Sequence, residues 1–258
     1  MPDHPPAVRL RLSGPRFVSI LAAIVGCLIL LSFLTLFLRI YTTAAQTSLG
    51  SNLIYWFNTD VESNIPALFS GFLLITAAAL LAIVAACASA RKETFRRYWW
   101  TLAAMFLYLA CDEVGQLHER FSAGLPKQFK AAGVEAPSWM HWAWVLPALV
   151  IVTVVGTLFL RMVLSLPKQT RNLFFLSGIM YVGGALGMEM LGGHLETLYG
   201  HGPEVLLESA VEETLEMTGI LLFIHALVGY LGQTSPAIRI ELSPPAPQAA
   251  EQEYRKAA

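Results

Sequence analysis

The feature that most constrains this chain is a series of long stretches without charged residues. The first contains 22 uncharged residues from Phe17 to Leu38, and a second runs for 28 residues from Ser63 to Ala90. A helix that crosses a bilayer needs about 20 mostly apolar residues. Only 14% of the chain is charged, against about 25% in soluble domains. The sequence therefore predicts an integral membrane protein.

Six segments meet this length requirement, so we expect an all-α fold, a polytopic transmembrane helix bundle with six spans. The apolar run of the first span is longer than the roughly 7–15 residues of a signal-peptide core, which indicates a retained helix. The expected spans are 17–40, 63–90, 97–121, 140–164, 172–197 and 205–231. The expected regions are a basic N-terminal tail at 1–16, the transmembrane domain at 17–231 and a disordered C-terminal tail at 232–258.

Lysine and arginine predict the orientation, because they gather in the cytoplasmic loops of membrane proteins. They cluster in the N-terminal tail, at 91–97 and at 161–171, whereas 40–90 and 172–238 contain none. Both termini and both tails are therefore expected in the cytoplasm. The formal net charge of -1 gives no indication of a nucleic-acid partner.

With this orientation, acidic residues from four spans fall in the outer half of the bundle. CDEVGQLHE (111–119) ends the third span and GMEMLGGHLE (187–196) ends the fifth. NTDVESNIP (58–66) precedes the second span, and PEVLLESAVEETLEMTG (203–219) begins the sixth. A charged side chain near the bilayer centre costs about 2.5–3.5 kcal/mol. Nearby basic residues are too few to balance these acids, so protons, water or a bound cation must stabilise them.

Carboxylates with a few histidines are the ligands of metal centres in helical bundles, although this chain lacks the Glu-x-x-His pairs of the ferritin-like type. We therefore expect one or two divalent metal ions, Fe, Mn or Zn, as cofactor. Asp112, Glu119 and Glu213 are expected to orient the ligands or to act as a catalytic acid or base. The expected metal ligands are Glu113, His118, Glu189, Glu212, Glu216, Glu62, His194 and Glu208.

The predicted function is metal-dependent chemistry near the extracytoplasmic face on an apolar or lipid-like substrate that enters from the membrane. Whether the protein is an enzyme stays open at this point. One alternative is a proton- or cation-coupled transporter, for which His225 is the single hint of an inward path. A second alternative is a structural membrane subunit. The expected partners are membrane lipids and the substrate, without nucleic acid.

The motifs DExxxxHE (112–119), the glutamate of GMEM (187–190) and EExxE (212–216) resemble a family of uncharacterised bacterial six-helix integral membrane proteins. The DxExNIP stretch at 60–66 is similar to that family too, and the resemblance extends to about Gly219. It implies that the acids act as a unit. It also implies a multi-pass protein of the bacterial inner membrane.

Overall fold

The computed structural model describes residues 13–59, 64–118 and 144–234, and the elements within these residues are all helical, as predicted. The predicted tails fall mainly on residues outside this part of the chain. The elements in chain order are α1 (Gly14–Tyr41), the 3₁₀ turn η1 (Ala44–Gln46), α2 (Ser48–Phe57), α3 (Ile65–Ala90), α4 (Arg96–Gly115), α7 (Val145–Leu164), α8 (Lys168–Val182), the π-helical segment η3 (Gly183–Met188), α9 (Glu189–Tyr199) and α10 (Pro203–Thr234).

Five helical segments are long and apolar enough to cross a membrane: α1, α3, α7, the continuous α8–η3–α9 segment and α10. These five candidate spans indicate that the chain is a membrane protein. The helix expected as the third span, α4, is 20 residues long but is not among them. Its sequence begins with two arginines and contains Asp112 and Glu113 in its last turn, which lower its hydropathy.

Two helix boundaries differ from the sequence-based expectation. The span expected at 97–121 is interrupted after Gly115, because Gln116 adopts a left-handed conformation with φ 51°. The loop expected at 41–62 contains a ten-residue helix, α2. The Thr47 side chain caps α2 by accepting a hydrogen bond from the Gly50 backbone N–H. A helix of ten residues is too short to be recognised as a membrane span from its hydropathy.

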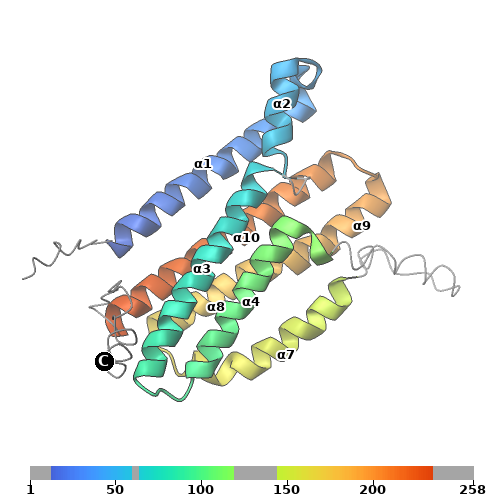
Figure 1. Ribbon diagram of the computed structural model, residues 1–258. Coiled ribbons are helices and arrows are strands. Elements are labelled where there is room, and N and C mark those ends of the chain that lie inside the picture. The colour runs from blue at the N-terminus through green and yellow to red at the C-terminus, as the bar shows by residue number, and fades with distance from the viewer. Residues whose placement is uncertain (1–12, 60–63, 119–143, 235–258) are drawn as a thin grey trace, which may run out of the picture.

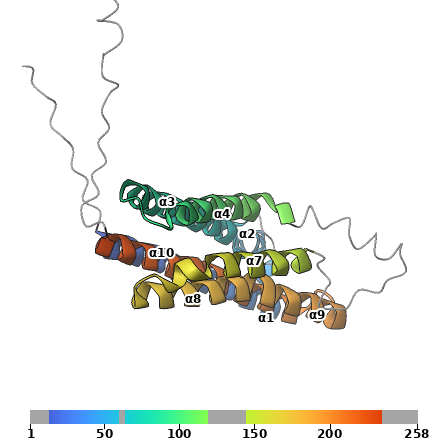
Figure 2. The ribbon, with the colours of Figure 1, turned by 90° about the horizontal axis from the view of Figure 1, so that it is seen from below.

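The helix α10 is the centre of the bundle and packs against α8, α3, α1 and the η3–α9 segment. α3 and α4 form an antiparallel hairpin (Figure 1) that lies as a layer over α8, α9 and α10 (Figure 2). Gly219 permits the close approach of α10 to α8. A β-carbon at this position would lie 2.8 Å from the Tyr181 backbone nitrogen and 3.0 Å from the Ser177 carbonyl oxygen.

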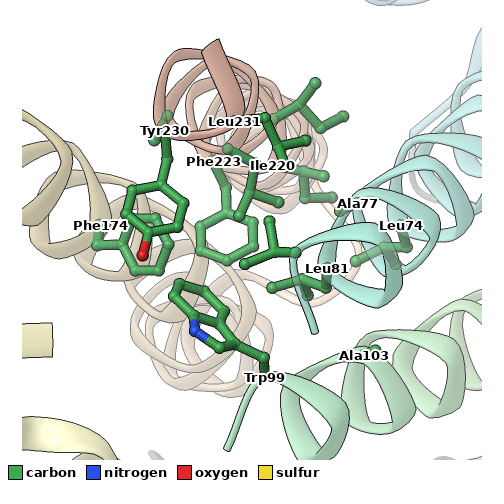
Figure 3. Close-up of a cluster of buried hydrophobic side chains, with 14 of the residues drawn as sticks. Leu74, Ala77, Leu81, Trp99, Ala103, Phe174, Ile220, Phe223, Tyr230 and Leu231 are labelled. Carbon is green, nitrogen blue, oxygen red and sulfur yellow. The ribbon is translucent and has the colours of Figure 1, made fainter. Parts of the chain in front are cut away.

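Aromatic side chains fill the space between α4, α8 and α10 at one end of the bundle (Figure 3). Trp99 is 1% exposed, and its ring centroid lies 5.4 Å from that of Tyr230 and 6.2 Å from that of Phe174. Phe223 stacks on Phe106 with the two centroids 4.7 Å apart. This core closes that end of the bundle with apolar rings.

The start of α1 and the end of α10 lie together at this same end of the bundle (Figure 1). A β-carbon on Gly14 would lie 2.5 Å from Val228, and Arg91 of the α3–α4 turn donates a hydrogen bond of 3.3 Å to the Thr234 carbonyl. Among the described residues, all lysines and arginines except Arg39 belong to this end: Arg16, Arg91, Lys92, Arg96, Arg97, Arg161, Lys168 and Arg171. We call it the basic end and the opposite one the acidic end.

Candidate functional site: an acidic cavity

A cavity of about 590 Å³ lies in the acidic half of the bundle between α4, α7, the α8–η3–α9 segment and α10. Its lining, as far as the described residues show, contains no lysine or arginine. One wall, formed by α4 and α7, is mainly apolar. The titratable acids and histidines that line the cavity are Asp112, Glu113, His118, Glu189, Glu196, His201, Glu208, Glu212, Glu213 and Glu216.

The α10 wall carries Glu208, Glu212 and Glu216, spaced four residues apart on one face of the helix. Glu208 is 5% exposed and Glu216 is 9% exposed, so these carboxyl groups are held inside the protein. Glu213 lies off this stripe by sequence, yet it also lines the cavity. The crowding of carboxyl groups away from bulk water requires compensation by positive charge, protons or bound water.

Two glycines of the facing helix make room for these glutamates. A β-carbon on Gly192 would collide with the Glu208 carboxylate and would lie 2.9 Å from its Cδ. A β-carbon on Gly184 would lie 2.9 Å from Glu216 Cγ and 3.0 Å from the Glu212 carbonyl oxygen. Two α10 glutamates therefore rest directly against the backbone of η3 and α9.

The π-helical segment η3 interrupts the helix that carries these glycines, and Glu189 follows it immediately. A π segment inside an α-helix changes the direction in which the following side chains point, and such segments are frequent at functional sites. Glu189 lines the cavity together with the α10 glutamates. Apart from its glycines, nothing in the sequence indicates this segment.

Asp112 and His118 form a pair across the left-handed turn at Gln116. Asp112 Oδ1 accepts a hydrogen bond of 2.9 Å from the His118 backbone N–H, and Oδ2 lies 2.9 Å from His118 Nδ1. The same aspartate accepts from the Gln116 N–H through its backbone carbonyl, at 2.7 Å. The end of α4 is thus folded so that one carboxylate fixes the orientation of the imidazole.

Trp144 stands opposite this pair at the start of α7. Its ring centroid lies 4.5 Å from that of His118, with the ring planes at 52°. The Trp144 indole N–H is buried and meets no hydrogen-bond acceptor among the residues that the structure describes. Trp144 is therefore a donor at the boundary between the acidic and apolar parts of the cavity.

Most of the predicted site residues come together in this cavity. Those that line it are Asp112, Glu113, His118, Glu189, Glu208, Glu212, Glu213 and Glu216. His194 is exposed and does not belong to the lining. Glu62 and Glu119 lie outside the described residues. The prediction did not include Glu196 and His201, which lie 3.8 Å apart (Glu196 Oε1 to His201 Nδ1) in the lining.

The described part of the chain contains no group of three or more His, Cys, Asp or Glu side chains arranged to hold a metal ion. The carboxyl groups share one cavity but do not converge on one point. The metal centre therefore stays a prediction, and binding would require several glutamates to turn toward each other.

A family model matches residues 20–231, from α1 to near the end of α10, under the description "Domain of unknown function (DUF8692)". The chain belongs to this family. The match agrees with the resemblance to an uncharacterised family and covers every described residue of the cavity. No curated protein and no solved structure matches the chain.

Proposed function

We propose that the acidic cavity binds one or two divalent metal ions, Fe, Mn or Zn, and carries out metal-dependent chemistry on an apolar or lipid-like substrate. One observation carries this proposal: carboxyl groups from α4, α9 and α10 line a single cavity whose described lining has no lysine or arginine. A cation is the simplest partner for such a lining, and oxygen ligands with imidazole suit these metals. Intramembrane ionisable groups are also functional more often than structural.

The Asp112–His118 pair supports the metal assignment. A histidine that binds a metal through one ring nitrogen commonly donates its other N–H to a carboxylate, which fixes the ring. Asp112 lies 2.9 Å from His118 Nδ1, so His118 would offer Nε2 to the metal. Glu189, Glu212 and Glu216 line the same cavity from the facing helices and would complete the ligands.

The apolar wall supports the proposed substrate class. Leu109 of α4 and Ile151 and Val152 of α7 face the same space as the acids. A substrate bound there would lie with apolar atoms against this wall and with its polar part toward the carboxyl groups. Asp112 and Glu213 would then be in position to move protons at the polar part.

We further propose that α4 is a sixth span and that both termini are cytoplasmic. The start of α1 and the end of α10 lie at the same end of the bundle, which favours an even number of crossings. The five apolar segments become six only if α4 crosses as well. The arginines and lysines of the basic end favour the cytoplasm for that end, in the inner membrane of a bacterium.

A transport path is less well supported than a one-sided site. His225, the expected hint of an inward path, is exposed on the outside of α10. Between the cavity and the basic end, the rings of Trp99, Phe174 and Phe223 occupy the bundle interior. A cation would have to displace this aromatic core to reach the basic end.

The test is elemental analysis by mass spectrometry of detergent-purified protein, with the double variant Glu189→Gln/Glu212→Gln beside the wild type. We expect one or two equivalents of Fe, Mn or Zn in the wild type and loss of the metal in the double variant. Glu204→Gln is the matched control, because Glu204 is exposed and does not line the cavity. Wild-type protein without metal, even after purification in metal-supplemented, chelator-free buffer, would sink the proposal.

A further inference from the structure

The apolar wall of the cavity lies between α4 and α7, which are not among the helix pairs that pack closely in the described chain. Two ring contacts bridge them, one toward each end of the bundle. At the basic end, the Tyr98 and Phe159 rings meet edge to face with centroids 5.3 Å apart. At the acidic end, His118 meets Trp144. Between these two ring contacts, Tyr108 and Leu109 of α4 and Ile151 and Val152 of α7 line the cavity.

The cavity reaches the outer surface of the bundle between these contacts. Tyr108 of α4 and Ile151 of α7 both line the cavity, yet Tyr108 is 55% exposed and Ile151 is 59% exposed. A side chain that both lines a cavity and faces outward stands at its opening. In a bundle that spans a bilayer, an opening between the middles of two spans faces the hydrocarbon core. Apolar molecules dissolved in the membrane therefore have direct access.

The polar part of the cavity restricts the headgroup of such a molecule. The acids of α10 and α9 repel an anionic headgroup, because the described lining offers no lysine or arginine to balance it. The buried Trp144 indole N–H meets no acceptor among the described residues. A hydroxyl or carbonyl oxygen would accept a hydrogen bond from it, whereas an ammonium group has no lone pair to do so and would compete with the metal ion that the proposed function places among the acids.

We propose that the substrate is a single-chain amphiphile with an uncharged, oxygen-bearing headgroup, and that it enters from the membrane between α4 and α7. Its chain lies against Leu109 and Val152, and its headgroup oxygen lies near Trp144 and the carboxyl groups. The cavity volume of about 590 Å³ is within the range of roughly 300–1,000 Å³ that holds one small molecule. This inference rests on the proposed function of the cavity and adds the entry route and the headgroup chemistry.

The test uses full-length protein in phosphatidylcholine vesicles, with the native cysteines Cys27, Cys87 and Cys111 replaced by alanine. A bimane fluorophore is attached to Ile151→Cys, at the opening, or to Val150→Cys, which is 63% exposed but does not line the cavity. The quenchers are three nitroxide-labelled alkyl chains of one length, with hydroxyl, sulfate or trimethylammonium headgroups. All three probes quench any label that faces the membrane. This nonspecific quenching rises linearly with the probe concentration.

We expect the hydroxyl probe to add a saturable component to the quenching of the label at position 151, but not at position 150. The two charged probes should give only linear quenching at both positions. Leu109→Trp, across the opening, should remove the saturable component, whereas Leu107→Trp, on the exposed side of α4, should keep it. Equal linear quenching at both labels with the hydroxyl probe overturns the proposal. Stronger saturable quenching by a charged probe also overturns it.

This measurement needs no metal, so its outcome is separable from that of the metal analysis. Saturable quenching in protein without bound metal would keep the entry route and sink the metal proposal. Bound metal without saturable quenching would support the metal proposal and overturn the entry route. Size-exclusion profiles and helical circular dichroism identify variants that fail to fold, and the comparison of labels 150 and 151 decides the question without the tryptophan variants.

Discussion

The Glu208 carboxylate lies against Gly192, at the place where any other residue would carry its β-carbon. Gly192→Ala should therefore move the carboxylate out of its position. Because that carboxylate is the far end of a flexible side chain, the shift should cost little stability. We expect near-normal thermal unfolding in detergent with a reduced metal content per protein.

Gly187→Ala is the matched control for this prediction, because a β-carbon on Gly187 would meet nothing within 4 Å. It lies in the same helical segment, and alanine favours helix over glycine by about 1 kcal/mol. It should leave the metal content unchanged. Equal metal content in both variants would mean that the position of Glu208 is irrelevant to the site.

Gly219→Ala should be clearly destabilising, since a β-carbon there would lie 2.8 Å from the Tyr181 backbone nitrogen. Backbone atoms cannot turn away as a side chain does, so α10 and α8 would have to separate. Overpacking of this kind costs about 1–3 kcal/mol. The measurement is the unfolding midpoint in detergent, with Gly229→Ala, which would meet nothing within 4 Å, as control. An unchanged midpoint would show that the two helices can separate without loss of stability.

The spacing of charged residues predicted much of the site. Glutamates at i, i+4 and i+8 must share one face of a helix, so the stripe of Glu208, Glu212 and Glu216 followed from the sequence alone. The all-α fold followed from the apolar runs in the same way. The gathering of the acids at one end of the bundle then followed from the alternation of helix directions.

Other parts of the site depend on backbone conformations that carry no periodic signal. Gln116 is a non-glycine residue with a positive φ, and η3 is a π-helix inside an otherwise regular segment. Both change which side chains face the cavity. His201 lies in the turn between α9 and α10 and reaches the lining from there, and α2 is too short to be recognised from hydropathy. Such features arise from tertiary packing rather than from local spacing.

Asp112→Ala should loosen the end of α4. It removes the acceptor of the His118 backbone N–H and the partner of the His118 ring, both at 2.9 Å. We expect faster amide hydrogen exchange in peptides that contain Gln116 and His118, measured by mass spectrometry in detergent. Exchange at the start of α4, around Trp100, is the internal control and should not change. Unaltered exchange at His118 would contradict a role for Asp112 in holding this turn.

Trp99→Ala should destabilise the protein far more than Trp100→Ala. Trp99 is 1% exposed within the aromatic core, whereas Trp100 is 48% exposed. Loss of a buried tryptophan costs about 3–5 kcal/mol. Trp100 contributes one hydrogen bond of 3.3 Å to Ser89 Oγ, a far smaller loss. Unfolding by sodium dodecyl sulfate in mixed micelles measures both variants, and similar midpoints would refute the assignment of the core.

The number of spans can be decided by labelling single cysteines in the cysteine-free protein. If α4 crosses the membrane, Thr94→Cys and Gln169→Cys lie on the same side, and Glu204→Cys lies on the opposite side. If α4 does not cross, α7 carries position 169 to the side opposite position 94. All three positions are exposed. A membrane-impermeant maleimide applied to inside-out vesicles should label 94 and 169 but not 204, because the basic end is expected in the cytoplasm. Labelling of 94 without 169 would show that α4 does not cross and would overturn the six-span topology.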